Sequence, residues 1–115
     1  MATIVEEISK SHQMQTSEML RELGFPAHRF GYIHLCLMVP YFAQDYRRSI
    51  TKDVYPYAAT HFGYDDWRPI ERSTRDLITD CWNERDPTIW ETYFPNLKTA
   101  PSNKRFIATL AARLK

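Results

Sequence analysis

Apolar residues recur along most of this chain at intervals of three and four positions, which is the spacing of amphipathic helices. No long stretch alternates apolar and polar residues as a half-buried strand would, and only three glycines occur. At 115 residues the chain is most simply one domain. The pattern therefore predicts an all-α fold, a compact bundle of about six helices.

Glycine and proline separate the predicted helices. We expect helices at 1–23, 27–45, 52–61, 66–84 and 87–93, and a last one from 103 onward. The second is nearly apolar over Tyr32–Phe42 and should be the central buried element, although Pro40 should kink or split it. Thr51 and Ser102 are the expected N-caps of the helices that follow them.

The first predicted helix changes character along its length. Residues 9–16 are polar, so we expect them to fray as a tail, whereas Met19, Leu20 and Leu23 are apolar. In this interpretation residues 1–19 are a partly helical N-terminal extension or linker, and residues 20–115 form the folded domain.

The predicted helix at 66–84 has two chemically different faces. Four charged residues fall on one face: Arg68, Glu71, Arg72 and Arg75. Five other residues fall on a second face that can pack inward: Ile70, Thr74, Leu77, Ile78 and Cys81. A short helix that ends at a glycine, followed by such a helix, is typical of a helix-turn-helix. Arginine at this place can reach guanine in a major groove, and glutamate can accept from cytosine. The alternative is a plain solvated helix face.

The net charge of +1 conceals an uneven distribution. Residues 92–115 contain five basic residues and no acidic ones, whereas residues 65–91 contain four basic and eight acidic ones. A second basic cluster lies at 47–52. Basic clusters on both sides of the candidate helix fit contacts to DNA phosphates, although solvated surface is the simpler explanation of each. The residues expected to contact phosphate are Thr51, Lys52, Arg68, Arg47, Arg48 and His28. For Thr51 and Lys52 a simple helix cap is the alternative, and for His28 a structural hydrogen bond.

Other classes of function lack the residues they need. No Cys-x-x-Cys or His-x-x-x-His pair occurs, so we expect no metal site. No glycine-rich phosphate loop appears, and no catalytic triad in its usual order, so we expect no cofactor and no enzyme activity. No apolar run approaches the ~20 residues that span a membrane, and the N-terminal residues lack the pattern of a secretory signal, so we expect neither feature. Cys36 and Cys81 lie in apolar patterns. We expect two buried thiols in a reducing cytoplasm, with a disulfide as the alternative.

Four stretches in a fixed order carry a family resemblance. They are Leu23-Gly24-Phe25-Pro26-Ala27-His28 with Gly31-Tyr32, Ile50-Thr51-Lys52 with Tyr55-Pro56, Ala59 and Phe62, Glu71-Arg72 with Arg75, Ile78 and Trp82, and Pro101-Ser102-Asn103 with Phe106-Ile107-Ala108. Over about residues 20–115 the chain resembles the C-terminal DNA-binding domain of the sporulation initiation response regulator of endospore-forming bacteria.

The resemblance implies a sequence-specific regulator of transcription that binds double-stranded DNA. Glu71, Arg72 and Arg75 would contact the bases of a TGTCGAA-like element from a recognition helix at about 66–84. The resemblance further implies a head-to-tail dimer on adjacent DNA elements and a contact between about 86–94 and an RNA polymerase sigma factor.

Several positions depart from the family pattern and motivate an alternative function. Pro69 stands where a basic residue is common and Asp76 where a histidine is common, while Thr60 and His61 replace typical lysines. Fewer cations near DNA weaken the phosphate contribution to binding. The alternative is a protein-interaction module of the same fold in which DNA binding is weakened or lost.

Overall fold

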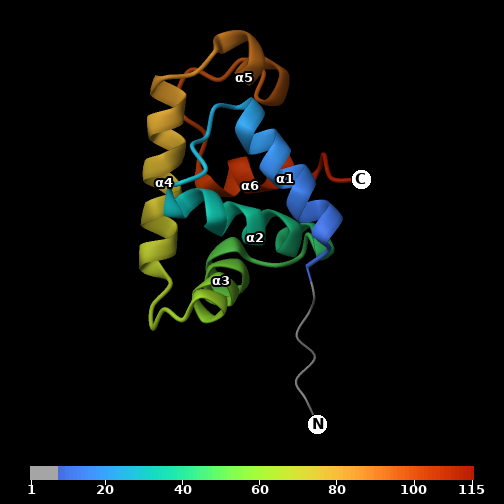
Figure 1. Ribbon diagram of the computed structural model, residues 1–115, viewed down its shortest axis with the longest axis vertical. Coiled ribbons are helices and arrows are strands. Elements are labelled where there is room, and N and C mark those ends of the chain that lie inside the picture. The colour runs from blue at the N-terminus through green and yellow to red at the C-terminus, as the bar shows by residue number, and fades with distance from the viewer. Residues whose placement is uncertain (1–7) are drawn as a thin grey trace.

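The computed structural model describes residues 8–115, and within them the chain forms six α-helices, one π-helical turn and no strand (Figure 1). In chain order these are α1 (Lys10–Glu22), α2 (Phe30–Gln44), η1 (Ile50–Val54), α3 (Tyr55–Phe62), α4 (Arg68–Asn83), α5 (Pro87–Tyr93) and α6 (Asn103–Ala111). The prediction of an all-α fold is confirmed. Residues 1–7 of the predicted first helix lie outside the described residues. None of the described helices is both long and apolar enough to cross a bilayer.

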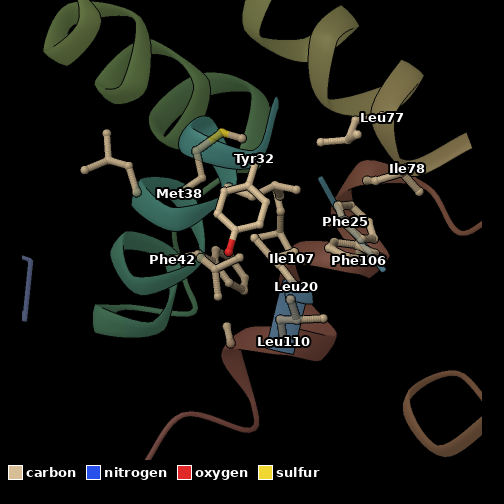
Figure 2. Close-up of a cluster of buried hydrophobic side chains, with 14 of the residues drawn as sticks. Leu20, Phe25, Tyr32, Met38, Phe42, Leu77, Ile78, Phe106, Ile107 and Leu110 are labelled. Carbon is tan, nitrogen blue, oxygen red and sulfur yellow. The ribbon is translucent and has the colours of Figure 1, made fainter. Parts of the chain in front are cut away.

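Helix α2 runs through the middle of the fold, as predicted, and packs against α1, α4 and α6 (Figure 1). Side chains from all four helices meet in the core, including Leu20, Met38, Leu77 and Phe106 (Figure 2). The predicted split at Pro40 does not occur, because α2 continues through this residue to Gln44. The helix starts at Phe30 rather than residue 27, since the preceding residues form a turn.

Helix α1 begins at Lys10, within the polar stretch that was expected to fray. The hydroxyl oxygen of Ser9 accepts a hydrogen bond from the backbone N–H of His12 and caps the helix. Thr16 is fully buried because its hydroxyl donates to the backbone carbonyl of His12, which satisfies its polar group inside the helix. Part of this polar stretch is therefore packed, which its composition did not indicate.

The start of the third helical segment differs from the prediction. Ser49, not Thr51, is the N-cap: its hydroxyl oxygen accepts from the backbone N–H of Lys52 at 3.0 Å. The first turn, η1, is wide, with the N–H of Val54 bonded to the carbonyl of Ser49 five residues back. In a regular α-helix the ring of Pro56 would crowd the carbonyl of the residue four positions before it, and the wide turn spans that region.

Helices α3 and α4 follow one another as the two helices of a helix-turn-helix would. Gly63 ends α3 in the left-handed conformation, with φ of 76°, as predicted. The carboxylate of Asp66 accepts from the backbone N–H of Arg68 at 2.9 Å, and Pro69 lies in the first turn of α4. The Tyr55 and Trp67 rings stack with centroids 5.4 Å apart, which joins the start of α3 to the start of α4.

Candidate nucleic-acid interface

The charged face of α4, which we define as Arg68, Glu71, Arg72 and Arg75, points away from the core. The three arginines are exposed and Glu71 is partly buried. The opposite face is buried, as predicted, through Ile70, Thr74, Leu77, Ile78 and Cys81. Packing of that apolar face leaves three cations and one carboxylate pointing outward along a helix that fits a major groove.

Glu71 and Arg75 form an ion pair one helical turn apart. The Arg75 Nη1 atom donates to Glu71 Oε2 at 2.6 Å, and the two side chains are 55% and 29% exposed. Such a pair contributes only about 0.3–0.5 kcal/mol to stability, so its main effect is to hold the two groups side by side. Within the described residues Arg72 makes no hydrogen bond or ion pair, which leaves its five donors available to a ligand.

A buried amide from α6 fixes the backbone behind this face. Asn103 is only 8% exposed, and its Nδ2 donates to the backbone carbonyl of Glu71 and to the hydroxyl of Tyr55, both at 3.0 Å. These two bonds tie the starts of α3 and α6 to the part of α4 that carries the charged face. Asn103 belongs to one of the four stretches that carry the family resemblance, but the sequence did not indicate this role.

Helix α2 supports α4 from the other side. Gly31 lies so close that a Cβ atom there would be 2.8 Å from the carbonyl oxygen of Ser73. The Ser73 hydroxyl donates to the carbonyl of Ile70 and lies 2.9 Å from the His34 Nδ1 atom. Burial lowers the pKa of His34 to about 4, so its imidazole is neutral at physiological pH and its Nδ1–H can donate to Ser73.

Arg68, a predicted phosphate contact, is paired at the foot of α4. Its guanidinium lies 2.6 Å from the Asp66 carboxylate, and the arginine side chain is 75% exposed. The hydrogen bonds from Arg68 lower the pKa of Asp66, so this carboxylate is ionised at neutral pH. Arg68 therefore lies on the charged face with its guanidinium already paired with the Asp66 carboxylate.

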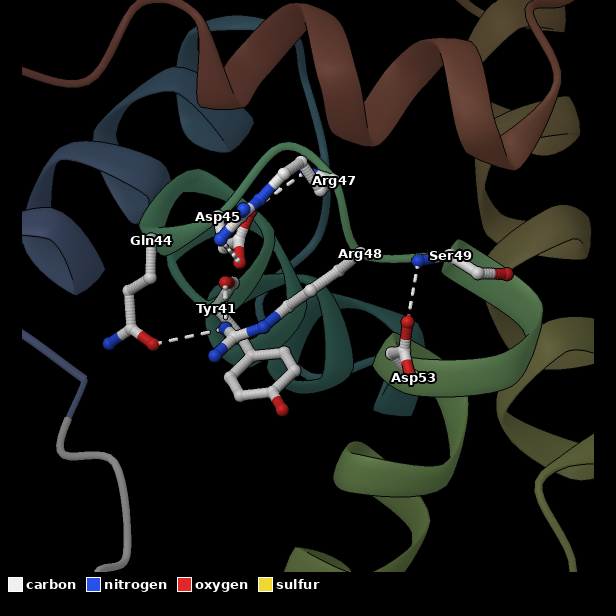
Figure 3. A network of polar contacts seen from close by, with 7 residues as sticks. All are labelled: Tyr41, Gln44, Asp45, Arg47, Arg48, Ser49 and Asp53. Carbon is white, nitrogen blue, oxygen red and sulfur yellow. Dashed lines mark hydrogen bonds and ion pairs between the residues drawn. The ribbon is translucent and has the colours of Figure 1, made fainter.

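The loop after α2 holds its two arginines in different ways (Figure 3). Arg47 turns back on Asp45 through two hydrogen bonds of 2.9 and 3.0 Å, and this pairing lowers the pKa of Asp45 to about 2. Arg48 lies 3.8 Å above the centre of the Tyr41 ring and donates to the Tyr41 backbone carbonyl at 2.6 Å. Arg48 is thus directed back onto α2, which the sequence did not indicate.

The six predicted phosphate contacts do not form one cluster. Thr51 and Lys52 are exposed on η1, close in sequence to Arg47. His28 is exposed in the turn before α2, whereas Arg47 follows the opposite end of that helix. Since α2 has 15 residues, it separates these two positions by about 20 Å.

Lys104 is a basic residue near the candidate interface that sequence reasoning did not single out. It lines a groove of about 430 Å³ together with Arg47, Arg48, Ser49, Thr51 and Tyr55, which we call the basic groove. Lys104 lies 57 and 56 positions from Arg47 and Arg48 along the chain, so only the fold brings them together. The +5 charge of residues 92–115 was the only signal that pointed toward it.

The other reactive side chains have ordinary structural surroundings. Cys36 is partly buried and Cys81 buried, both are free thiols, and burial raises the pKa of each to about 11. Both thiols are therefore protonated and weakly nucleophilic at neutral pH. Among residues 8–115, no group of three or more His, Cys, Asp or Glu side chains is placed to hold a metal ion.

Comparison with known families agrees with this geometry. Residues 16–114 match the family model described as "Sporulation initiation factor Spo0A C terminal". This family is the DNA-binding effector domain of a transcription factor and not a family of enzymes. Because the match covers nearly the whole chain, the protein belongs to the Spo0A C-terminal domain family.

Proposed function

We propose that this domain binds double-stranded DNA in a sequence-specific manner, with α4 in the major groove of a TGTCGAA-like element. The observation that carries the proposal is the exposed charged face of α4, held in place by buried contacts from α2 and α6. In this proposal Arg72 and Arg75 donate to guanine O6 and N7, and Glu71 accepts from a cytosine amino group.

The predicted phosphate contacts would bind or attract the DNA backbone. Arg68 at the foot of α4 and the pair Thr51 and Lys52 on η1 are exposed, and they would contact phosphates on either side of the groove. Arg47 and Arg48 would add long-range attraction, since a surface cation raises the local potential even without a direct contact. His28 would donate a hydrogen bond to a phosphate oxygen.

Fluorescence anisotropy across a salt series tests this proposal. A labelled duplex with two TGTCGAA elements is compared with a scrambled duplex, using the wild type, Arg72→Ala and Arg75→Ala. We expect each variant to lose about 1–3 kcal/mol of binding free energy on the specific duplex and little on the scrambled one. Arg21→Ala, an exposed change of the same charge on α1, is the matched control and should bind like the wild type.

Two outcomes would contradict base contacts by these residues. Equal losses on both duplexes would make Arg72 and Arg75 phosphate contacts. Wild-type binding that is weak on both duplexes and vanishes at moderate salt would remove the DNA-reading function altogether.

We also propose that two copies bind adjacent elements head to tail, as the family resemblance implies. The proposal predicts that one domain binds a duplex with a single element and that a second joins when an adjacent element is added. Analytical ultracentrifugation of the two complexes measures the stoichiometry. One domain on both duplexes would contradict the dimer.

A contact with an RNA polymerase sigma factor is the third part of the proposal. Helix α5 lies at the end of α4 away from α3 (Figure 1). Next to its start is a depression of about 440 Å³, which we call the acidic depression. Its lining includes the apolar residues Leu23, Pro26 and Cys81 and the acidic residues Glu22, Asp80, Glu84 and Asp86. These four carboxylates outnumber the two arginines of the lining, Arg29 and Arg85, the first of which is paired with Asp80. A basic amphipathic segment of the sigma factor would complement this surface.

Calorimetric titration with the purified sigma factor tests this contact. Glu84 is exposed at the end of α4, so Glu84→Lys changes the charge of the acidic depression without removing a buried group. We expect this variant to weaken binding to the sigma factor and leave DNA binding unchanged. Glu18→Lys on α1 is the control, and equal binding by both variants would contradict a contact at this surface.

The second candidate function is a protein-interaction module that has lost DNA binding. One observation favours it: Asp76 is exposed one helical turn after Arg72, and a carboxylate there repels phosphate. This function predicts no measurable DNA binding at moderate salt, together with retained binding to the sigma factor. The salt series described above separates it from the first proposal.

A further inference from the structure

We propose that the basic groove binds the DNA backbone beside the major groove occupied by α4, and that Lys104 is its principal phosphate contact. This inference rests on the proposed DNA-reading function of α4. It adds a second contact surface that comes from the last helix of the fold, outside the helix-turn-helix.

The basic groove combines the donor groups that DNA backbones commonly engage. Arg47 and Lys104 supply cationic groups, and Ser49 and Thr51 supply hydroxyls. Arginine, lysine, serine and threonine side chains provide many of the contacts to phosphate oxygens in protein–DNA complexes. A phosphodiester chain is therefore a chemically suitable occupant for this surface.

The basic groove lies next to the charged face of α4. Tyr55, which lines the groove, accepts a hydrogen bond from Asn103, and the same Asn103 amide donates to the backbone carbonyl of Glu71. Lys104 directly follows Asn103 in the chain. Two hydrogen bonds through one amide thus link the groove to the part of α4 that carries the residues proposed to read bases.

Lys104 is the cation of this groove that has no partner among residues 8–115. Its side chain is exposed and, within residues 8–115, makes no hydrogen bond or ion pair. Arg47 is 92% exposed but shares its charge with Asp45, and Arg48 is bound to Tyr41. An ammonium on a flexible stem can follow a phosphate without displacing another partner.

The surrounding charge also favours an anion. Arg47, Arg48 and Lys104 line the groove, and Asp45 is the carboxylate paired with the first of them. The Asp53 carboxylate also lies beside the groove, where it accepts from the Ser49 backbone N–H at 2.7 Å. Two guanidinium groups and one ammonium thus outnumber two carboxylates. The free-energy cost of removing water from a phosphate at this surface is offset by hydrogen bonds from several donors. An apolar partner would instead leave these charges with neither water nor a counterion.

The test uses the same anisotropy assay with Lys104→Ala. A phosphate contact does not distinguish bases, so we expect weaker binding to both duplexes and an unchanged ratio of specific to scrambled affinity. The slope of log K against log salt should fall in magnitude by about 1, as for the loss of one phosphate contact. Lys104→Arg should retain the binding and the slope. Lys98→Ala, an exposed lysine in the loop before α6, is the matched control and should behave like the wild type.

The outcomes separate this inference from the function on which it rests. If the wild type prefers the specific duplex but Lys104→Ala binds with the same affinity and salt slope, the inference is wrong and the DNA-reading function stands. If Lys104→Ala changes the ratio of the two affinities, Lys104 contacts a base and is not a backbone contact. If the wild type binds neither duplex, both proposals fail. Thermal unfolding of each variant by circular dichroism confirms that the exposed substitutions leave the fold intact.

Discussion

Asn103, the first residue of α6, donates a hydrogen bond of 3.0 Å to the backbone carbonyl of Glu71. Glu71 lies in the first half of α4. The same amide group reaches the Tyr55 hydroxyl at the start of α3. One buried side chain therefore connects three helices directly behind the charged face. In the proposed function that face fits a groove of fixed shape, so its position would depend on this buried amide as well as on the charged residues themselves.

We predict that Asn103→Ala lowers both stability and DNA discrimination. The substitution removes the donor to two buried oxygens, which should reduce the free energy of unfolding by about 1–3 kcal/mol. It should also reduce the preference for the specific duplex, since α4 loses a positional restraint. Urea denaturation and anisotropy measure the two effects. Asn83→Ala, at the exposed end of α4, is the control, and an equal response of both variants would contradict this role for Asn103.

Ser49 and Thr51 should differ in their effects on stability. Ser49 caps η1 through the backbone N–H of Lys52, whereas the Thr51 side chain is exposed. We expect Ser49→Ala to reduce the free energy of unfolding by about 1 kcal/mol and Thr51→Ala to change it little. If Thr51 contacts phosphate, its variant instead weakens DNA binding on every sequence. A larger loss of stability for Thr51→Ala in urea denaturation would contradict this assignment.

A methyl group at Gly31 should separate α2 from α4. The added Cβ would lie 2.8 Å from the Ser73 carbonyl oxygen and 2.9 Å from a methyl carbon of Leu77. Overpacking of this kind costs about 1–3 kcal/mol. The change from glycine to alanine gains roughly 1 kcal/mol in helix propensity, which is less than most of that range. We therefore expect Gly31→Ala to lower the thermal midpoint. An unchanged or raised midpoint would show that the two helices adjust freely.

Local sequence patterns predicted much of the fold because they depend on neighbouring residues. The spacing of apolar residues placed the inward face of α4 correctly, and the apolar run at 32–42 identified α2 as the central helix. Caps and stops at Ser102 and Gly63 followed from the backbone groups that each helix end leaves unpaired.

Contacts between distant residues account for what the sequence did not reveal. His34 and Ser73 are 39 positions apart, and Asn103 and Glu71 are 32 apart, so no local pattern links them. The choice between Ser49 and Thr51 as a cap depended on where the chain turns into η1. The composition of the basic clusters likewise gave no sign that Arg48 binds Tyr41. These features arise from tertiary packing and not from local propensity.

Protonation of His34 should reduce stability in mildly acidic solution. Burial lowers its pKa from 6.5 to about 4, so between these values the unfolded chain binds a proton that the folded chain does not. The free energy of unfolding should therefore fall as the pH falls from 6.5 to about 4, by an amount on the order of 3 kcal/mol at most. Urea denaturation across this window measures the effect, and titration of the imidazole resonances by NMR assigns it.

Two substitutions separate His34 from the other groups that titrate. His34→Asn keeps a nitrogen donor near Ser73 but cannot be protonated, so its stability should depend less on pH than that of the wild type. His28→Asn, at an exposed position, is the matched control. The assignment fails if the His34→Asn and wild-type curves remain parallel across the window.

Glu71 should matter much more for base preference than for folding. Its ion pair with Arg75 is exposed, so Glu71→Gln should change the free energy of unfolding by no more than about 0.5 kcal/mol. A glutamine amide pairs better with adenine, whereas a carboxylate accepts from cytosine, so the variant should shift its preference at one base pair. Anisotropy with duplexes that carry each single substitution in the TGTCGAA element identifies that position. Glu18→Gln on α1 is the control. An equal change at every position would show that Glu71 acts through charge alone, since a direct base contact is local to one pair.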